Sequence, residues 1–224
     1  MFLKNGNFVK NVHVSEKTNN RFDQDAASWD AKEYRIKMAG NVTEAIRNEV
    51  ILNSGMDLMD FGCGTGLVSL PMAAEAGSLT GVDNSAGMLE VFLTKAAEMN
   101  LPNVKRLNLN LGDGDTLPGS YDLILSSMAF HHVKDISSLI RLLVDALNPG
   151  GYLCIADLDS ENGLFHADNT GVYHFGFDRE NMMELFRLSG LKEVRACTAS
   201  NMPRTGNDGV ERDFPIFLIT GVKQ

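Results

Sequence analysis

The sequence has little cysteine and no long apolar run. Its three cysteines, Cys63, Cys154 and Cys197, are too few and too scattered for a disulfide framework or a zinc cluster. No stretch approaches the apolar length that spans a bilayer, and the first ten residues lack the apolar centre of a signal peptide. These absences argue against a membrane partner and favour a reducing compartment, so we expect a cytoplasmic protein.

Basic residues are also in short supply. Twenty Lys and Arg stand against 29 Asp and Glu, which leaves a net charge of −9. This charge repels a phosphate backbone, and no basic run offsets it. We therefore expect no nucleic-acid partner. The remaining composition, 44% hydrophobic and 22% charged, is that of an ordinary globular protein.

Apolar periodicity divides the 224 residues into three parts. Residues 1–20 are polar without a sustained period and are predicted to be a flexible N-terminal arm. Residues 21–53 carry apolar side chains at helical spacing and end at Asn53-Ser54-Gly55. Residues 56–224 then alternate strand and helix patterns. We expect residues 21–224 to form a single domain, because the length suits one α/β core with an N-terminal helical segment.

The pattern of the core predicts a parallel sheet. Apolar runs indicate strands at residues 58–61, 79–82, 104–109, 121–126 and 152–157, and helical patterns lie at 67–76, 88–99 and 136–147. Such alternation implies a doubly wound α/β fold with helices on both faces and a ligand crevice at the carboxyl ends of the strands. In the last quarter, Asp178 is predicted to cap a helix ending at Ser189, and strands at 194–199 and 216–222 flank a loop that contains Pro203 and Gly209.

A glycine-rich turn follows the first predicted strand. The residues are Asp60-Phe61-Gly62-Cys63-Gly64-Thr65-Gly66, and the glycines allow a tight turn and a close backbone approach to a ligand. A dinucleotide-binding G-x-G-x-x-G pattern would place its third glycine at position 67, which is Leu67. The acid Asp60 suits the cationic end of a methionine moiety, directly or through water, and would repel a pyrophosphate.

This turn resembles motif I of the class I S-adenosylmethionine-dependent methyltransferases, and the resemblance extends over most of the chain. Leu79-Thr80-Gly81-Val82-Asp83 is similar to motif II, in which the acid binds both ribose hydroxyls. The stretch around Asn148-Pro149-Gly150-Gly151 resembles the turn into the fifth strand. The family implies a Rossmann-like seven-stranded sheet of order 3-2-1-4-5-7-6 with strand 7 antiparallel. It also implies that residues 21–53, which contain Trp29, are a lid over the cofactor.

The cofactor that the resemblance implies is S-adenosyl-L-methionine. Adenine recognition has two alternatives, Asn110, which we prefer, and Asp113. The complete predicted cofactor set is Trp29, Asp60, Phe61, Gly62, Cys63, Gly64, Gly66, Asp83, Asn84, Met88, Asn110, Leu111, Asp113 and Ser126.

Two histidines follow the fourth predicted strand. His131 and His132 resemble the paired histidines of many small-molecule methyltransferases, and either could be a general base, since the unperturbed pKa of histidine is near neutrality. The alternative is that one packs behind the loop and the other lines the pocket. The Asn/Asp-Pro-Pro-aromatic motif of base-modifying amino-methyltransferases does not occur here, which argues against methylation of nucleobases.

The loop after the fifth predicted strand is acidic and contains histidine. It resembles a loop of uncharacterised bacterial methyltransferases of the ubiquinone-biosynthesis-like type. Its ligand spacing matches no defined metal site, so we predict no metal. The residues predicted to line the substrate pocket are Phe130, Asp157, Asp159, Glu161, His166 and His174.

The sequence thus predicts an enzyme that transfers a methyl group to an unidentified small molecule. A non-catalytic S-adenosylmethionine-binding regulator is an alternative, because the cofactor half of the pattern is far more recognisable than the catalytic half. A dinucleotide-dependent oxidoreductase is a weaker one. A homodimer is an assembly that the sequence permits without specifying.

Overall fold

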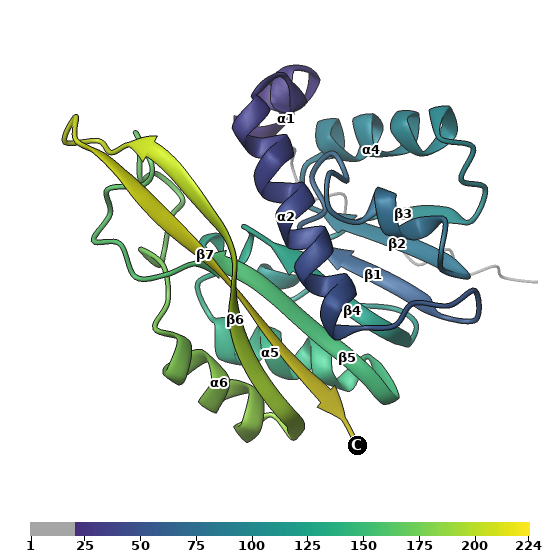
Figure 1. Ribbon diagram of the computed structural model, residues 1–224. Helices are drawn as coiled ribbons and strands as arrows, with labels where there is room; N and C mark the ends of the chain where they lie inside the picture. Colours follow the sequence, from purple (N-terminus) through teal and green to yellow (C-terminus); the bar gives the residue numbers. More distant parts are fainter. Residues whose placement is uncertain (1–20) are drawn as a thin grey trace, which may run out of the picture.

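The strands form one mixed sheet in the computed structural model, which describes residues 21–224 (Figure 1). The sheet order is β3-β2-β1-β4-β5-β7-β6, and β7 runs antiparallel to β5, so the predicted fold is confirmed. The strands are β1 (Asp57–Phe61), β2 (Ser78–Asp83), β3 (Val104–Asn108), β4 (Tyr121–Ser127), β5 (Leu147–Leu158), β6 (Leu191–Thr205) and β7 (Glu211–Lys223). The predicted arm at residues 1–20 lies outside the described residues.

Helices cover both faces of the sheet. They are α1 (Arg21–Asp25), α2 (Glu33–Glu49), α3 (Leu70–Ala73), α4 (Ala86–Glu98), α5 (Ile136–Asp145) and α6 (Arg179–Leu188), with short 3-10 turns η1 (Ala26–Ala31), η2 (Leu111–Asp113) and η3 (Phe130–His132). None of the helices within residues 21–224 is long and apolar enough to cross a membrane.

Strand alternation separates the core into two layers. Leu58 of β1 is buried in the layer that contains Phe92 of α4, whereas its neighbour Met59 is buried in the layer that contains Leu143 of α5. Successive side chains of a strand point to opposite faces, so a strand buried on both sides reads as a continuous apolar run. The α2, α3 and α4 helices therefore lie on one face, and α5 and α6 lie on the other.

The central strands end beside one another. Phe61, the last residue of β1, pairs with Val82 of β2 and with Ser126 of β4. All of these strands are parallel, so the loops that follow them leave the sheet at the same edge. This register brings the predicted glycine turn, the end of β2 and the paired histidines into one region.

Helix α3 is shorter than the predicted helix at residues 67–76. It covers only Leu70–Ala73, and the residues from Gly62 to Ser69 form turns. Pro71 lies in the first turn of α3, the position that proline favours, so the helix begins at Leu70 and not at residue 67. The correction moves the helix start away from the glycine turn.

The last two strands are longer than the predicted segments at 194–199 and 216–222. Their ladder continues from Leu191↔Lys223 to Thr205↔Glu211, so Pro203 lies in β6 and the loop shrinks to the residues between Thr205 and Glu211. The turn closes by a hydrogen bond from the Gly206 N–H to the Val210 carbonyl, and Arg212 pairs with Asp208 at 2.8 Å. These local contacts extend the hairpin beyond the sheet, as Figure 1 shows.

Gly62 provides a test of the packing behind the glycine turn. A Cβ at Gly62 would lie 2.4 Å from the Ala129 Cβ, and the φ of Gly62 is +69°. Gly62→Ala is therefore expected to lower the free energy of unfolding by roughly 2–5 kcal/mol, from backbone strain and overpacking.

The matched control is Gly40→Ala in α2, where a Cβ would meet nothing within 4 Å. That substitution is expected to raise the free energy of unfolding by about 0.5–1 kcal/mol, because alanine is the better helix former. Urea denaturation of both variants measures the two changes in the free energy of unfolding. Equal stabilities for Gly62→Ala and the unsubstituted chain would contradict the packing argument.

Candidate functional site

The glycine turn is held against β2 by backbone hydrogen bonds. The N–H groups of Gly62 and Cys63 donate to the Val82 carbonyl at 2.8 and 3.1 Å. A Cβ at Gly66 would lie 2.6 Å from the Phe92 ring, so Gly66 is closed in by the core. A Cβ at Gly64 would meet nothing within 4 Å. Gly64 is therefore the position of the turn where backbone faces open space.

Asp83 links this turn to the start of α4. One carboxylate oxygen accepts from the Gly64 N–H at 2.9 Å, and the other accepts from the Ser85 N–H at 2.8 Å. Burial raises the pKa of Asp83, while these N–H groups act in the opposite direction. A carboxylate has about four lone-pair positions, so Asp83 retains the capacity to accept further hydrogen bonds.

A second acid lies beneath the turn. Asp60 is only 3% exposed, and burial together with the negative charge of Asp83 raises the pKa of Asp60 to about 7. Burial also raises the pKa of the Cys63 thiol, which keeps that group neutral. Two carboxyl groups in a poorly hydrated place favour a positively charged ligand over an anionic one, because each carboxylate gains from a nearby cation.

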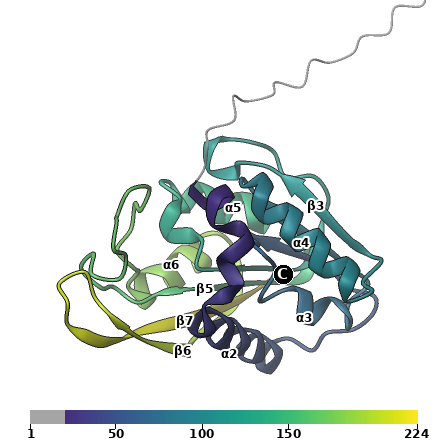
Figure 2. The same ribbon diagram turned by 90° about the horizontal axis from the view of Figure 1, so that it is seen from above.

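The N-terminal segment closes over this region through two acids that the sequence analysis did not identify. Asp23 accepts from the Ser85 hydroxyl at 2.6 Å and from the Gly87 N–H at 2.8 Å. Asp30 accepts from the Thr65 hydroxyl at 2.6 Å and pairs with Lys95 at 2.6 Å. Figure 2 shows the first helices lying beside α4 at this edge. Their partners are distant in sequence, so no local pattern could have indicated them.

Trp29 of the same segment is partly exposed. The Arg35 guanidinium stacks over its ring at 3.5 Å, and Phe22 meets it edge to face at 5.8 Å between centroids. Phe22 also contacts the His132 ring, at 5.4 Å. The segment thus joins the glycine turn to the paired histidines.

The remaining predicted cofactor residues lie around the same edge. Met88 and Leu111 are buried, and the Ser126 hydroxyl donates to the Phe61 carbonyl at 2.8 Å, which ties β4 to β1. Asn84 lies between β2 and α4. Asn110 precedes η2, and its N–H donates to the Asp115 carboxylate at 2.8 Å. The choice between Asn110 and Asp113 for adenine stays a prediction.

His131 is held by a buried acid. Its Nδ1 lies 2.7 Å from an oxygen of Asp157, and both residues are almost completely buried. The same carboxyl group accepts from the N–H of Leu158 at 2.7 Å and from the N–H of His131 at 3.3 Å. These contacts fix the orientation of the imidazole. Its Nε2 is left as the available ring nitrogen.

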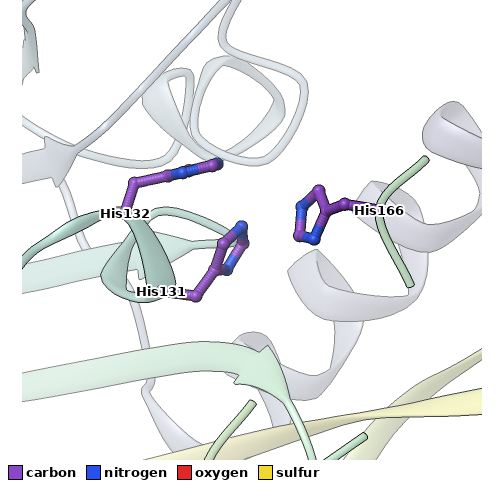
Figure 3. A group of neighbouring side chains, drawn as sticks. All are labelled: His131, His132 and His166. Atoms are coloured by element: carbon purple, nitrogen blue, oxygen red, sulfur yellow. The ribbon is translucent and has the colours of Figure 1, made fainter. Parts of the chain in front are cut away.

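Two further histidines lie against His131 (Figure 3). His132 has its Nδ1 2.8 Å from the Gly171 carbonyl, and His166 comes from the loop after β5. Burial and the neighbouring His131 lower the pKa of His132 to about 4 and that of His166 to about 3. Both imidazoles are therefore neutral at neutral pH.

The other predicted pocket residues hold loops in place. Asp159 forms a two-point ion pair with Arg179, and the Glu161 carboxylate accepts from the N–H groups of Leu164 and Phe165. These contacts give Asp159 and one oxygen of Glu161 partners within the protein, while the other oxygen of Glu161 is buried without one among the described residues.

The other two predicted pocket residues, His174 and Phe130, also have partners within the protein. His174 has its Nε2 2.9 Å from the Val133 carbonyl. Phe130 is fully buried and packs edge to face on Phe61. A role of Phe130, Asp157, Asp159, Glu161, His166 and His174 in contacting a substrate stays a prediction.

Comparison with known proteins agrees with this geometry. Residues 59–153 match the family described as methyltransferase domain. An uncharacterized methyltransferase of Schizosaccharomyces pombe is 33% identical over 156 residues, which cover 63% of this chain and 55% of that protein. A ubiquinone biosynthesis O-methyltransferase of Sodalis glossinidius is 27% identical over 143 residues, which cover 62% of this chain and 57% of that protein. The matches thus span little more than half the length of these relatives.

Solved structures share the fold. The phosphoethanolamine N-methyltransferase 2 of Haemonchus contortus, in complex with S-adenosyl-L-methionine, superposes with a TM-score of 0.66 at 17% identity. The match covers 93% of this chain and 61% of that one. At this identity the likeness concerns the fold alone.

The role of Asp30 in holding the N-terminal segment can be tested by proteolysis. Asp30→Ala removes the acceptor for Thr65 and the partner of Lys95, two charge-assisted contacts together worth about 1–3 kcal/mol. We expect trypsin to cleave near Lys32 and Arg35 several-fold faster in this variant. Asp25→Ala is the control, because Asp25 is contacted by Ser28 through its backbone carbonyl. Equal cleavage rates in the two variants would show that Asp30 does not hold the segment.

Proposed function

We propose that this chain, whose residues 59–153 match a methyltransferase domain, is a class I enzyme that transfers a methyl group from S-adenosylmethionine to a small molecule. The observation that carries the proposal is the open space at Gly64, in a turn that follows the buried Asp60 and is hydrogen-bonded to the partly buried Asp83. Backbone without a Cβ allows a ligand to approach closely, and two acids select for a ligand that carries positive charge. The cytoplasmic location stays a prediction.

The charge of the site separates this function from the alternatives. S-adenosylmethionine is a cation at its sulfonium, whereas the pyrophosphate of a dinucleotide is an anion that Asp60, at the start of the glycine turn, would repel. Leu67 in place of a third glycine argues in the same direction. An oxidoreductase that uses a dinucleotide is therefore disfavoured on two independent grounds.

The residues around Gly64 would hold the cofactor in distinct ways. Asp83 would accept the ribose hydroxyls, and Asp60 would favour the cationic amino-acid end. Asn110 would accept the adenine amino group. Trp29, Asn84, Met88, Leu111 and Ser126 would form the surrounding walls.

S-adenosylmethionine supplies an electrophilic methyl group, so the tasks of the chain are alignment and exclusion of water. The N-terminal segment suits the exclusion of water, since Asp23 binds the start of α4 and Asp30 binds the glycine turn. His131 and His132 are the candidate bases for an acceptor that must lose a proton. In each of them Nδ1 is engaged, so Nε2 is the atom that would receive the proton.

The acceptor class rests on the relatives and on the missing base-modification motif. The names of two relatives, an O-methyltransferase of ubiquinone biosynthesis and a demethylmenaquinone methyltransferase, describe small-molecule chemistry. A labelling screen with methyl-labelled S-adenosylmethionine against metabolite extracts, followed by mass identification, tests the function. Tight cofactor binding with no labelled product in any extract would favour the non-catalytic regulator instead.

Asp83 is predicted to contribute directly to cofactor binding. Asp83→Ala is expected to weaken S-adenosylmethionine binding by roughly 1–3 kcal/mol, since a charged hydrogen-bond partner is lost. Isothermal titration calorimetry measures this. Asp213→Ala is the matched control, because it removes the same charge from β7, on the other half of the sheet. Unchanged affinity in Asp83→Ala, with the fold verified by thermal unfolding, would remove Asp83 from the cofactor site.

Asp60 predicts a pH dependence of binding. In the free protein its pKa of about 7 means that the carboxyl group is largely protonated below neutrality, whereas the bound cation favours the ionised form. Binding then releases a proton, so affinity should fall as pH falls, by roughly five-fold between pH 7 and pH 6. In Asp60→Asn the affinity should be lower at pH 7 and flat over this range. A flat profile in the unsubstituted chain would contradict the role of Asp60.

A further inference from the structure

Three histidine side chains from two separate loops converge on one space at the carboxyl edge of the sheet. His131 and His132 lie in η3 after β4, and His166 lies in the loop after β5. One ring nitrogen of each lies within 4.8 Å of the other two. Figure 3 shows the three imidazoles facing one another across this space. The arrangement exists only in the folded chain, since 34 residues separate His132 from His166.

In two of these rings, His131 and His132, Nδ1 is held by a hydrogen-bond acceptor. A backbone carbonyl can only accept, so the Nδ1 of His132, at 2.8 Å from the Gly171 carbonyl, carries the proton. The Asp157 carboxylate places the proton of His131 on Nδ1 in the same way. Each ring then presents the lone pair of its Nε2. Histidines that bind metals almost always donate their other N–H to a carboxylate or a backbone carbonyl.

The third ring carries a polar atom that the fold does not satisfy. His166 Nδ1 is buried and has no hydrogen-bond partner among residues 21–224. A buried polar atom without a partner destabilises the fold unless a ligand or water satisfies it. His166 packs edge to face on Phe165 and tilts onto His131, so its position is defined by packing, while its nitrogen lacks a partner.

We propose that His131, His132 and His166 bind a divalent transition-metal ion, with Zn²⁺ the best fit. Imidazole nitrogen suits zinc and its neighbours in the transition series, whereas Mg²⁺ and Ca²⁺ prefer oxygen ligands. Three histidines with an open fourth position are a known ligand set of catalytic zinc sites. Tetrahedral Zn–N bonds of about 2.0–2.1 Å place ligand nitrogens about 3.4 Å apart, so the rings need only close by up to roughly 1.5 Å.

The metal would lie beside the glycine turn. Ala129, two residues before His131, packs on Gly62, and Phe22 of the N-terminal segment contacts His132. An open coordination position there suits an oxygen, nitrogen or sulfur atom of the methyl acceptor, a consequence that rests on the proposed function. As ligands, His131 and His132 would orient the acceptor through the metal and would not be general bases.

Metal binding is tested on the chelator-treated full chain by calorimetric titration with Zn²⁺ and by the visible spectrum with Co²⁺. We expect one ion per chain and tetrahedral Co²⁺ bands without the thiolate charge-transfer band that a site at Cys197 would give. His166→Ala is expected to abolish both signals. Because His166 is only partly buried, this variant should fold.

Two further variants separate ligands from neighbours. Asp157→Asn should weaken Zn²⁺ binding 10- to 100-fold, as loss of an outer partner does at metal sites. His174→Ala, whose ring contacts the Val133 carbonyl outside the cluster, should bind Zn²⁺ normally. Binding of S-adenosylmethionine is measured in every sample.

The outcomes are distinct. No stoichiometric metal, or binding that survives His166→Ala, overturns the site, and intact S-adenosylmethionine binding in the same sample leaves the proposed function standing. Loss of S-adenosylmethionine binding with metal binding intact contradicts the proposed function alone.

Discussion

The candidate site depends on a backbone that leaves β1 with positive φ at Gly62, Gly64 and Gly66. Residues other than glycine rarely adopt this conformation, because their Cβ collides with the neighbouring backbone. Gly62 and Gly66 are also enclosed by Ala129 and Phe92, so the turn has little freedom to move. Of the three glycines, only Gly64 faces open space, and the packing of Gly62 and Gly66 fixes its position.

Charge acts on the same turn from below and from above. Asp60 lies buried at the end of β1, and Asp83 accepts from the Gly64 N–H. From the N-terminal segment, Asp30 contacts Thr65 of the turn, and Asp23 contacts the start of α4. Except for Asp60, each of these acids accepts a hydrogen bond from the turn or from the start of α4. Carboxylates therefore both build the site and determine the sign of the ligand that it can bind.

The histidine cluster continues the same edge of the sheet. Its rings are anchored by Asp157 and by the Gly171 carbonyl, which come from β5 and from the loop that follows. That loop is in turn ordered by Glu161 and by the pairing of Asp159 with Arg179. These internal contacts account for much of the acidic character of the loop. Glu161 Oε1, His166 Nδ1 and Asn169 Oδ1 are left buried without a hydrogen-bond partner among the described residues, and of the three only the His166 atom belongs to the histidine cluster.

The sequence by itself determined the alternation of strands and helices, the position of the glycine turn and the acid at the end of β2, and its resemblance to known motifs implied the sheet order. These features have local signatures, namely apolar runs, glycine spacing and a resemblance to known motifs. Local patterns also indicated that Asp178 caps α6, and the Asp178 side chain indeed accepts from the Asn181 N–H. The predicted helix at residues 67–76 was too long, because helical periodicity does not register that Pro71 favours the first turn of a helix.

Only the tertiary structure decided which residues meet. Asp23 contacts α4 and Asp30 contacts the glycine turn, each across more than thirty residues of sequence. His166 contacts His131, which lies 35 positions earlier in the chain. The spacing of acids and histidine within the loop after β5 matches no defined metal site, so the sequence predicted none. Ligands drawn from separate loops have no fixed spacing, since parallel strands place their carboxyl ends together whatever the length of the connection between them.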